Sequence, residues 1–262
     1  MGPWLLFAAC AFWMGRVDGG TACNYPPQLW CSSAEIARAC KAEKHCALRA
    51  AAQPPRKAAP VSISLFYESL CPACRSYLVL ELIPTWLMLN DIMNVTLVPY
   101  GNARETKGPT KWEFDCQHGE DECLGNMMET CILHLLPDPL FHMLTIFCLE
   151  SSIYVSRNLQ TCMKLYFPHV PLDNITNCVN GELGNKLMHQ NAQLTEGLKP
   201  PHDYVPWILV NGKHTEDLQK QAQESLFKLV CSLYEANPIL PCQDPKSQAS
   251  LPHFPRDTCL RM

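Results

Sequence analysis

The chain has 262 residues, a hydrophobic fraction of 47% and a formal net charge of −4. The hydrophobic fraction is enough for a sizeable core, and it excludes a chain that is disordered throughout. The near-balanced charge excludes a basic nucleic-acid-binding surface and a polybasic membrane-binding patch, so we expect no nucleic-acid partner.

The N-terminal residues 1–20 predict a secretory signal peptide. Residues 3–15 form an apolar run, shorter than the ~20 residues that span a bilayer, and small residues follow it. The 16 cysteines agree with this interpretation, because so many are typical of an oxidising compartment. A buried apolar helix is the alternative interpretation. In a secreted chain, the Asn-x-Thr triplets at Asn94 and Asn174 predict glycans on the surface.

Residues 21–50 predict a small module held together by disulfides, because the segment is too short to bury much apolar surface. Its four cysteines are Cys23, Cys31, Cys40 and Cys46. Their spacing and the residues between them resemble a saposin A-type domain. Residues 51–60 follow as a linker or propeptide. Residues 236–262 predict a disordered C-terminal tail or propeptide, since they carry several prolines and no apolar period.

Residues 61–235 predict one α/β domain. The expected order is strand, helix, strand, helical block, strand pair and helix. Long crossovers imply parallel pairing with helices on the sheet faces, so we expect a thioredoxin-like fold with a helical insertion at about residues 112–197. The expected elements are strands at 61–67, 95–100 and 207–210, a hairpin turn at Asn211-Gly212, and helices at 75–89, kinked at Pro84, and 218–233.

Cys71-Pro72-Ala73-Cys74 lies where the first predicted strand ends and the first predicted helix begins. Free backbone N–H groups and the positive end of the helix dipole stabilise a thiolate at such a position. We therefore expect Cys71 to be an exposed nucleophile. Cys74 lies one turn later, so we expect it to be more buried and to resolve the mixed disulfide that Cys71 forms. A cellular thiol then reduces the Cys71–Cys74 disulfide, and no other cofactor is expected.

Two simpler interpretations of these two cysteines stay open. One is an inert structural disulfide. The other is half of a zinc site, completed by Cys116, His118 or Cys123. No second close Cys or His pair has the spacing of a zinc ribbon, so we expect no metal.

Val205-Pro206 directly precedes the predicted strand at 207–210. In thioredoxin-like folds, a cis proline at this point faces the active cysteines and leaves backbone groups open for substrate pairing. Pro206 is therefore a candidate cis proline, and Val205 is its substrate-binding neighbour. An ordinary trans turn proline is the alternative.

The segment from Cys116 to Cys131 resembles a family signature. Its fixed positions are Cys-Gln-His-Gly, two residues, Glu-Cys, two residues, Asn, four residues and Cys. The similarity extends to residues 97–103, 191–193 and 200–207. On these residues, the chain resembles the gamma-interferon-inducible lysosomal thiol reductases over about residues 60–235.

The resemblance implies a thiol reductase whose active pair is Cys71 and Cys74. It implies a lysosomal enzyme, also secreted as a precursor, that reduces disulfides of endocytosed proteins at acidic pH before antigen presentation. It also implies a sorting receptor that binds the N-glycans, and removal of both terminal propeptides. Two alternatives stay open, a secreted disulfide oxidase or isomerase of the same fold and a non-enzymatic, disulfide-rich binding protein.

The remaining cysteines of the module and the insertion are expected to be structural, with their pairing open. Removing Cys10 with the signal peptide leaves 15 of the 16 cysteines, so one is free or intermolecular. Cys242 and Cys259 in the tail are the candidates, and a disulfide-linked precursor dimer is the resulting hypothesis. His118 is expected to be structural. The expected structural cysteines outside the N-terminal module are Cys116, Cys123, Cys131, Cys148, Cys162 and Cys178.

Overall fold

The computed structural model describes residues 23, 25, 29–52, 58–236, 240–243 and 258–261. The predicted signal peptide at 1–20 lies outside the described residues. The chain divides into two compact units, Met1–Ala52 and Gln53–Met262. Within the described part, no helix combines the length and the apolarity that a bilayer span requires.

The first unit is small and its described residues are cross-linked twice. It contains the helices α1 (Ala34–Ala39) and α2 (Glu43–Ala52). The hydroxyl of Ser33 accepts a hydrogen bond from the N–H of Ile36 at 3.1 Å, which caps the start of α1. The disulfides join Cys23 to Cys40 and Cys31 to Cys46. The four cysteines that the sequence singled out are thus all paired, and the assignment to the saposin A-type stays a prediction.

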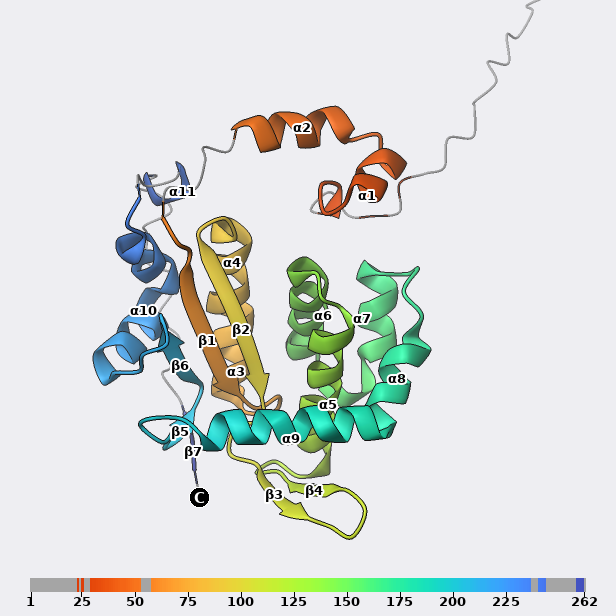
Figure 1. Cartoon of the computed structure of the whole chain (residues 1–262), viewed down its shortest axis with the longest axis vertical. Coiled ribbons are helices and arrows are strands. Elements are labelled where there is room, and N and C mark those ends of the chain that lie inside the picture. Colours follow the sequence, from red (N-terminus) through yellow and green to blue (C-terminus); the bar gives the residue numbers. More distant parts are fainter. Residues whose placement is uncertain are drawn as a thin grey trace, which may run out of the picture. The chain divides into compact units, whose positions relative to one another are not determined.

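The centre of the second unit is a three-stranded sheet in the order β2-β1-β6 (Figure 1). Strand β1 (Val61–Tyr67) pairs in parallel with β2 (Met93–Pro99) and antiparallel with β6 (Trp207–Val210). The strands predicted at 61–67 and 207–210 have these bounds in the structure. The parallel crossover confirms the predicted α/β class with a thioredoxin-like core.

A long helical segment connects β1 to β2. It consists of α3 (Pro72–Tyr77), a π-helical turn η2 (Leu78–Leu82) and α4 (Ile83–Leu89). The predicted helix at 75–89 is therefore present, and the irregularity expected at Pro84 appears just before it as the π turn. Pro84 has no N–H to donate to the preceding turn, and the wider turn accommodates its ring. Leu78, Leu82 and Leu89 are fully buried against the rest of the core.

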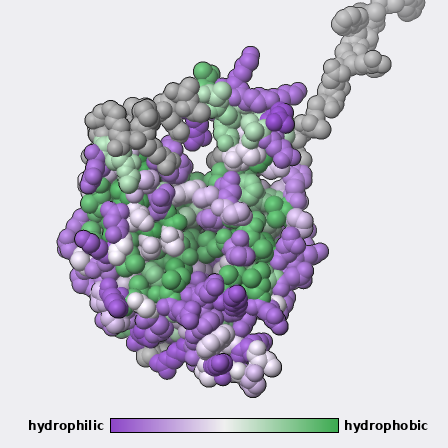
Figure 2. Space-filling model, viewed as in Figure 1, coloured by the Kyte–Doolittle hydropathy of each residue, from purple (hydrophilic) through white to green (hydrophobic). Residues whose placement is uncertain are grey.

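The insertion begins with a hairpin that the sequence analysis did not anticipate. Its strands β3 (Arg104–Lys107) and β4 (Trp112–Asp115) pair antiparallel. All four residues of β3 are polar, and the alternation of apolar and polar residues in β4 covers only four positions, which is too short to predict a strand. In the space-filling view, polar residues gather at the lower end of the molecule, where Figure 1 places this hairpin (Figure 2).

The rest of the insertion is helical, as predicted. Its elements are α5 (Glu120–Leu135), α6 (Pro139–Ser151), η3 (Val155–Arg157), α7 (Leu159–Tyr166), α8 (Leu172–Asn180) and α9 (Glu182–Glu196). Helix α5 is linked to α8 by Cys131–Cys178, and α6 is linked to α7 by Cys148–Cys162. A third bond, Cys116–Cys123, joins the loop before α5 to the first turn of that helix.

After the insertion, the chain returns to the sheet and then covers it with a helix. Strand β5 (Tyr204–Val205) leads into β6, and α10 (Glu216–Leu233) packs beside β6 (Figure 1). The predicted turn at Asn211-Gly212 is present, with φ of 49° and 75°. It is closed by a single bridge between Val210 and Lys213, so the predicted hairpin lacks a second strand.

The described part of the C-terminal tail is ordered, in contrast to the prediction for residues 236–262. It contains α11 (Leu240–Gln243) and β7 (Cys259–Leu260). Cys242 is bonded to Cys231 of α10, and β7 pairs antiparallel with β5. Two disulfides and a pairing strand hold this segment in place. Neither can be predicted from the composition of the segment itself.

Candidate functional site

Cys71 is the N-cap of α3 and follows the loop that leaves β1. Its backbone is extended, and its carbonyl oxygen accepts a hydrogen bond from the N–H of Arg75 at 3.0 Å. Pro72 is the first helical residue, where its missing N–H costs no hydrogen bond. The structure therefore places Cys71 at the predicted junction of strand and helix, where helix geometry favours a thiolate once the sulfur is free.

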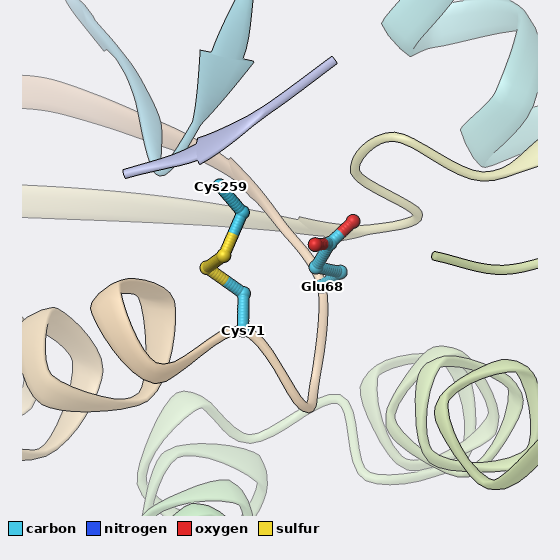
Figure 3. A group of neighbouring side chains, drawn as sticks. All are labelled: Glu68, Cys71 and Cys259. Carbon is cyan, nitrogen blue, oxygen red and sulfur yellow. A yellow bond between two sulfur atoms is a disulfide. The ribbon is translucent and has the colours of Figure 1, made fainter. Parts of the chain in front are cut away.

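The sulfur of Cys71 is bonded to that of Cys259. Cys259 lies in β7, so its sulfur reaches the site on a separate strand (Figure 3). Cys71 is 0% exposed. The prediction of an exposed thiol at Cys71 is therefore wrong for this state, because Cys71 carries the disulfide and the C-terminal strand lies over it. The two candidates for an unpaired cysteine are wrong as well, since Cys259 pairs with Cys71 and Cys242 pairs with Cys231.

Cys74 is the free cysteine among the described residues, and it is fully buried in α3. Burial raises the pKa of its thiol well above the ordinary value, and the charges of Glu68 and Glu150 raise it further. A hydrogen bond with the backbone of Glu68 opposes this shift and lowers the pKa. Cys74 is thus a protonated thiol one helical turn from the Cys71 sulfur, which is the placement predicted for a resolving cysteine.

The peptide bond between Val205 and Pro206 is cis, and Val205 is fully buried. Val205 pairs with Cys259, and Tyr204 pairs with Leu260, in the antiparallel ladder of β5 and β7. The candidate substrate-binding residue therefore lies beside the strand that supplies the second sulfur. The structure brings together Cys71, Cys74 and Val205-Pro206 as the sequence predicted.

Glu68 is a buried carboxyl group that the sequence analysis did not identify. One of its oxygens lies within 4.8 Å of both Cys71 Sγ and Cys259 Sγ. Figure 3 shows it on the loop between β1 and Cys71. Burial raises its pKa to about 8, the charge of Glu122 raises it too, and a hydrogen bond from the N–H of Asn102 at 2.9 Å opposes both. At acidic and neutral pH, Glu68 is therefore a neutral acid next to the reacting sulfurs.

Gly101 makes room for this carboxyl group. Its φ is +62°, and a Cβ at this position would lie 2.6 Å from Glu68 Oε2. Only a glycine combines this left-handed backbone with so close an approach. The loop after β2 is thus shaped to hold Glu68.

His118 and Glu122 of the signature segment complete a cluster with Glu68. His118 Nδ1 lies 2.5 Å from Glu122 Oε2 and 3.5 Å from Glu68 Oε1. One ligand atom from each of the three residues lies within 4.8 Å of the others, so the set has the reach to hold a cation. The close hydrogen bond with Glu122 already engages Nδ1 of His118. The prediction of no metal stays a prediction. Glu68, Cys71 and Cys259 also lie close together, but they cannot bind a metal ion in this state because the two sulfurs are joined in a disulfide.

The signature helix α5 supports the loop in front of Cys71. The side chain of Asn126 accepts a hydrogen bond from the N–H of Ser69 at 2.9 Å, and the Ser69 hydroxyl donates one to the carbonyl of Glu122 at 3.2 Å. Gly125 leaves space for Ser69, whose Cβ would lie 3.0 Å from a Cβ at position 125. These contacts give the signature segment the structural role that the sequence analysis expected for it.

A second group of acids lies behind the loop. The Tyr67 hydroxyl donates a hydrogen bond to Glu129 at 2.5 Å, and Arg75 donates to the carbonyl of Glu150 at 2.7 Å. Burial raises the pKa of both Glu129 and Glu150, while the charge of Arg75 lowers it. Burial therefore favours the neutral form of both acids, and Arg75 favours their ionised form.

The other predicted sites lie away from the sulfurs. Asn94 on β2 and Asn174 on α8 are both exposed, as glycan attachment requires. The ten cysteines expected to be structural are all paired within the chain: Cys23–Cys40, Cys31–Cys46, Cys116–Cys123, Cys131–Cys178 and Cys148–Cys162.

Comparison with known proteins identifies a family to which this chain is similar. Residues 62–166 match the family model of the gamma interferon inducible lysosomal thiol reductases. The chain is 50% identical to the gamma-interferon-inducible lysosomal thiol reductase of Carassius auratus, over 91% of each chain. It is 44% identical to that of Mus musculus, over 88% of each. Among solved structures, Chlamydia trachomatis DsbA is similar with a TM-score of 0.43 and 16% identity, over 61% of this chain and 80% of that chain.

Proposed function

This chain belongs to the gamma interferon inducible lysosomal thiol reductase family, and from that premise we propose that it reduces disulfide bonds of proteins through Cys71 and Cys74. Cys71 is the nucleophile and Cys74 is the resolving thiol. The names of the relatives place them in the lysosome, and we assign the same compartment to this chain.

The proposal rests on the bonding of three sulfurs, those of Cys71, Cys74 and Cys259. Cys71 is bonded to a sulfur on a separate strand, and Cys74 remains a free thiol in the next helical turn. A reductase forms this arrangement with its substrate halfway through the reaction. Cys259 occupies the position that a substrate sulfur takes.

The reaction follows from this arrangement. The Cys71 thiolate attacks one sulfur of a substrate disulfide, which forms a mixed disulfide and releases the other sulfur as a thiolate that takes up a proton. Cys74 then loses its proton and attacks the Cys71 sulfur, which releases the second substrate thiol and leaves a Cys71–Cys74 disulfide. Two external thiols reduce that disulfide and leave as their own disulfide. An external thiol is therefore the reductant, and the chain needs no bound cofactor for this chemistry.

Glu68 adapts the site to acid. Because its pKa is about 8, it carries a proton at lysosomal pH and lies within 4.8 Å of both sulfurs. A neutral acid at this position does not oppose the Cys71 thiolate, and it supplies a proton to the departing sulfur. An ordinary glutamate would be largely ionised near pH 5 and would repel the thiolate.

Reduction of insulin at pH 5, with a small thiol as the reductant, tests this function. We expect the wild-type chain to accelerate reduction, and Cys71→Ser to leave only the uncatalysed rate. Cys74→Ser should accumulate a covalent complex with insulin chains, because the mixed disulfide is not resolved. Glu182→Gln, at an exposed position on α9, is the control for handling and folding. A Cys71→Ser chain that keeps the wild-type rate would refute the proposal.

A further inference from the structure

The contacts of the C-terminal segment (residues 258–261) reveal a binding site that extends beyond the reacting sulfurs. Resting on the proposed function, we infer that β5, Asn102, Gln117 and Glu196 bind an extended substrate peptide. The half-cystine of the peptide takes the place of Cys259, and the site favours a basic residue two positions later. In the full chain, the C-terminal segment occupies this site as an internal substrate.

The first part of the argument is recognition of the peptide backbone. The segment adds to β5 as an antiparallel strand, and the N–H of Arg261 donates to the carbonyl of Asp203 at 2.8 Å. The amide of Asn102 donates to the carbonyl of Cys259 at 3.0 Å, and that of Gln117 donates to the carbonyl of Leu260 at 2.6 Å. These contacts involve only main-chain groups. Every residue offers the carbonyl oxygens, and every residue except proline offers the N–H, so the contacts do not depend on the sequence of the peptide.

The side chains of Asn102 and Gln117 are held in position to bind the peptide backbone. The Asn102 amide also donates to the Gln117 side chain at 2.9 Å, which fixes both groups relative to each other. Asn102 is buried, and its own N–H is held by Glu68. The side chains that bind the peptide are thus coupled to the carboxyl group beside the sulfurs. Gln117 of the signature segment therefore binds the peptide backbone, in addition to the structural role of that segment.

The second part is selectivity along the peptide. The side chain of Leu260 is 66% exposed, so the position after the half-cystine faces solvent and is not selected. At the next position, the guanidinium of Arg261 lies 2.8 Å and 3.0 Å from the two carboxylate oxygens of Glu196. Glu196 is the last residue of α9. A partly exposed ion pair of this kind contributes a selectivity of about three- to fivefold.

The consequence is a chain that blocks its own site. The bond between Cys71 and Cys259 has to open before a substrate strand replaces the segment. Attack of the Cys74 thiolate on Cys71 Sγ opens it, forms the Cys71–Cys74 disulfide and releases Cys259 as a thiol. Two external thiols then reduce the new disulfide. The reductant that drives turnover therefore also unblocks the enzyme.

Covalent capture of small peptide disulfides tests the site. The full chain carries Cys74→Ser and Cys259→Ser, which leaves Cys71 as the reacting thiol and prevents resolution. It is offered three symmetric peptide disulfides at pH 5, Thr-Cys-Leu-Arg, Thr-Cys-Leu-Ala and Thr-Cys-Leu-Glu, each with blocked ends. The rate of mixed-disulfide formation is followed by intact mass. The C-terminal segment competes equally with all three peptides, so their ratios report the site alone.

We expect the Arg peptide to be captured about three- to fivefold faster than the Ala peptide, and the Glu peptide to be the slowest. Adding Glu196→Gln should bring the Arg-to-Ala ratio close to one. Adding Glu182→Gln, an exposed change on the same helix, should leave the ratio as it is. Equal capture of the three peptides would overturn the inferred site and leave the reductase intact. Failure to capture any peptide would instead overturn the role of Cys71, and with it the proposed function.

Discussion

Cys71 and Cys259 are separated by 188 residues in the sequence, and in the structure their Cα atoms lie 6.2 Å apart in one disulfide. The bond joins the start of the helix that carries the reactive pair to a strand that lies beside Val205. One contact therefore determines both the accessibility of the nucleophile and the position of the peptide strand. Several measurable properties of the chain depend on it.

Cys259→Ser should expose the nucleophile. In the wild-type chain without reductant, Cys71 is in a disulfide and does not react with an alkylating reagent. In Cys259→Ser, reduced with a small thiol that is then removed so that no Cys71–Cys74 disulfide remains, the Cys71 sulfur is free at the N-cap of α3, where the helix start favours the thiolate. We expect rapid labelling of Cys71 at pH 5 in the variant and none in the wild type, measured by peptide mass. Cys74 should stay unlabelled in both because it is buried and its pKa is raised. Equal labelling of Cys71 in the two chains would contradict the cross-link.

Arg261→Glu should loosen the C-terminal segment. The substitution replaces an ion pair with Glu196 by a repulsion, so the segment separates from β5 more readily. We expect a small thiol to reduce the Cys71–Cys259 bond about three- to tenfold faster at low salt. The rate is measured by trapping Cys259 with maleimide. Leu260→Ser is the control, because that side chain is largely exposed and should leave the rate nearly unchanged. Identical rates for all three chains would show that Glu196 does not hold the segment.

Glu68 should make the fold less stable as the pH rises. Its pKa is about 8 in the folded chain and near 4.5 when unfolded, so between these values the folded state binds a proton that the unfolded state lacks. The free energy of unfolding then falls with pH, by up to about 1.4 kcal/mol per unit from this group, and the contribution is complete only below pH 4.5. Urea unfolding at pH 5, 6 and 7 should give a shallower decline for Glu68→Gln. Glu113→Gln, an exposed control, should keep the wild-type decline. Parallel curves for Glu68→Gln and the wild type would contradict the raised pKa.

The reactive pair and most of the sheet could be predicted from sequence because their signals are local. The alternation of residues 61–67 matches β1, and Cys71-Pro72-Ala73-Cys74 lies at the predicted junction. The periodic apolar positions of the insertion are buried in α7 and α8. In α5 the expected apolar stripe is only partly buried, since Leu124 is exposed and most of the buried residues of that helix are polar. In each case, a run of neighbouring residues contains the whole pattern.

The partner of Cys71 could not be predicted, because it depends on contacts between distant parts of the chain. Residues 258–261 have no β-pattern of their own, and β7 forms because β5 offers it a free edge. Glu68 gave no signal either. Its raised pKa comes from burial against Gly101 and from the charge of Glu122, which lies 54 positions further along the chain. The hairpin of β3 and β4 was missed because β3 is polar throughout and the alternation of β4 covers only four residues, too few to give a strand pattern.

Gly125→Ala should be harmful although it lies inside a helix. An exposed helical glycine usually gains up to about 1 kcal/mol of stability on replacement by alanine. At Gly125, the new methyl group would overlap the side chain of Ser69 and displace the loop before Cys71. We expect a loss of about 1–3 kcal/mol in unfolding free energy, together with slower insulin reduction. In a Ser69→Ala background the same change should cost less, because the hydroxyl that it meets first is absent. A Gly125→Ala chain as stable as the wild type would show that α5 does not set the position of this loop.

Disulfide mapping of the unreduced chain tests the central claim most directly. Trypsin releases residues 58–75, which contain both Cys71 and Cys74, and residues 257–261, which contain Cys259. After free thiols are alkylated at acidic pH under denaturing conditions, we predict one species in which these two peptides are linked through Cys71, with the alkyl group on Cys74. A peptide 58–75 that carries an internal Cys71–Cys74 disulfide, together with an alkylated Cys259, would contradict the account.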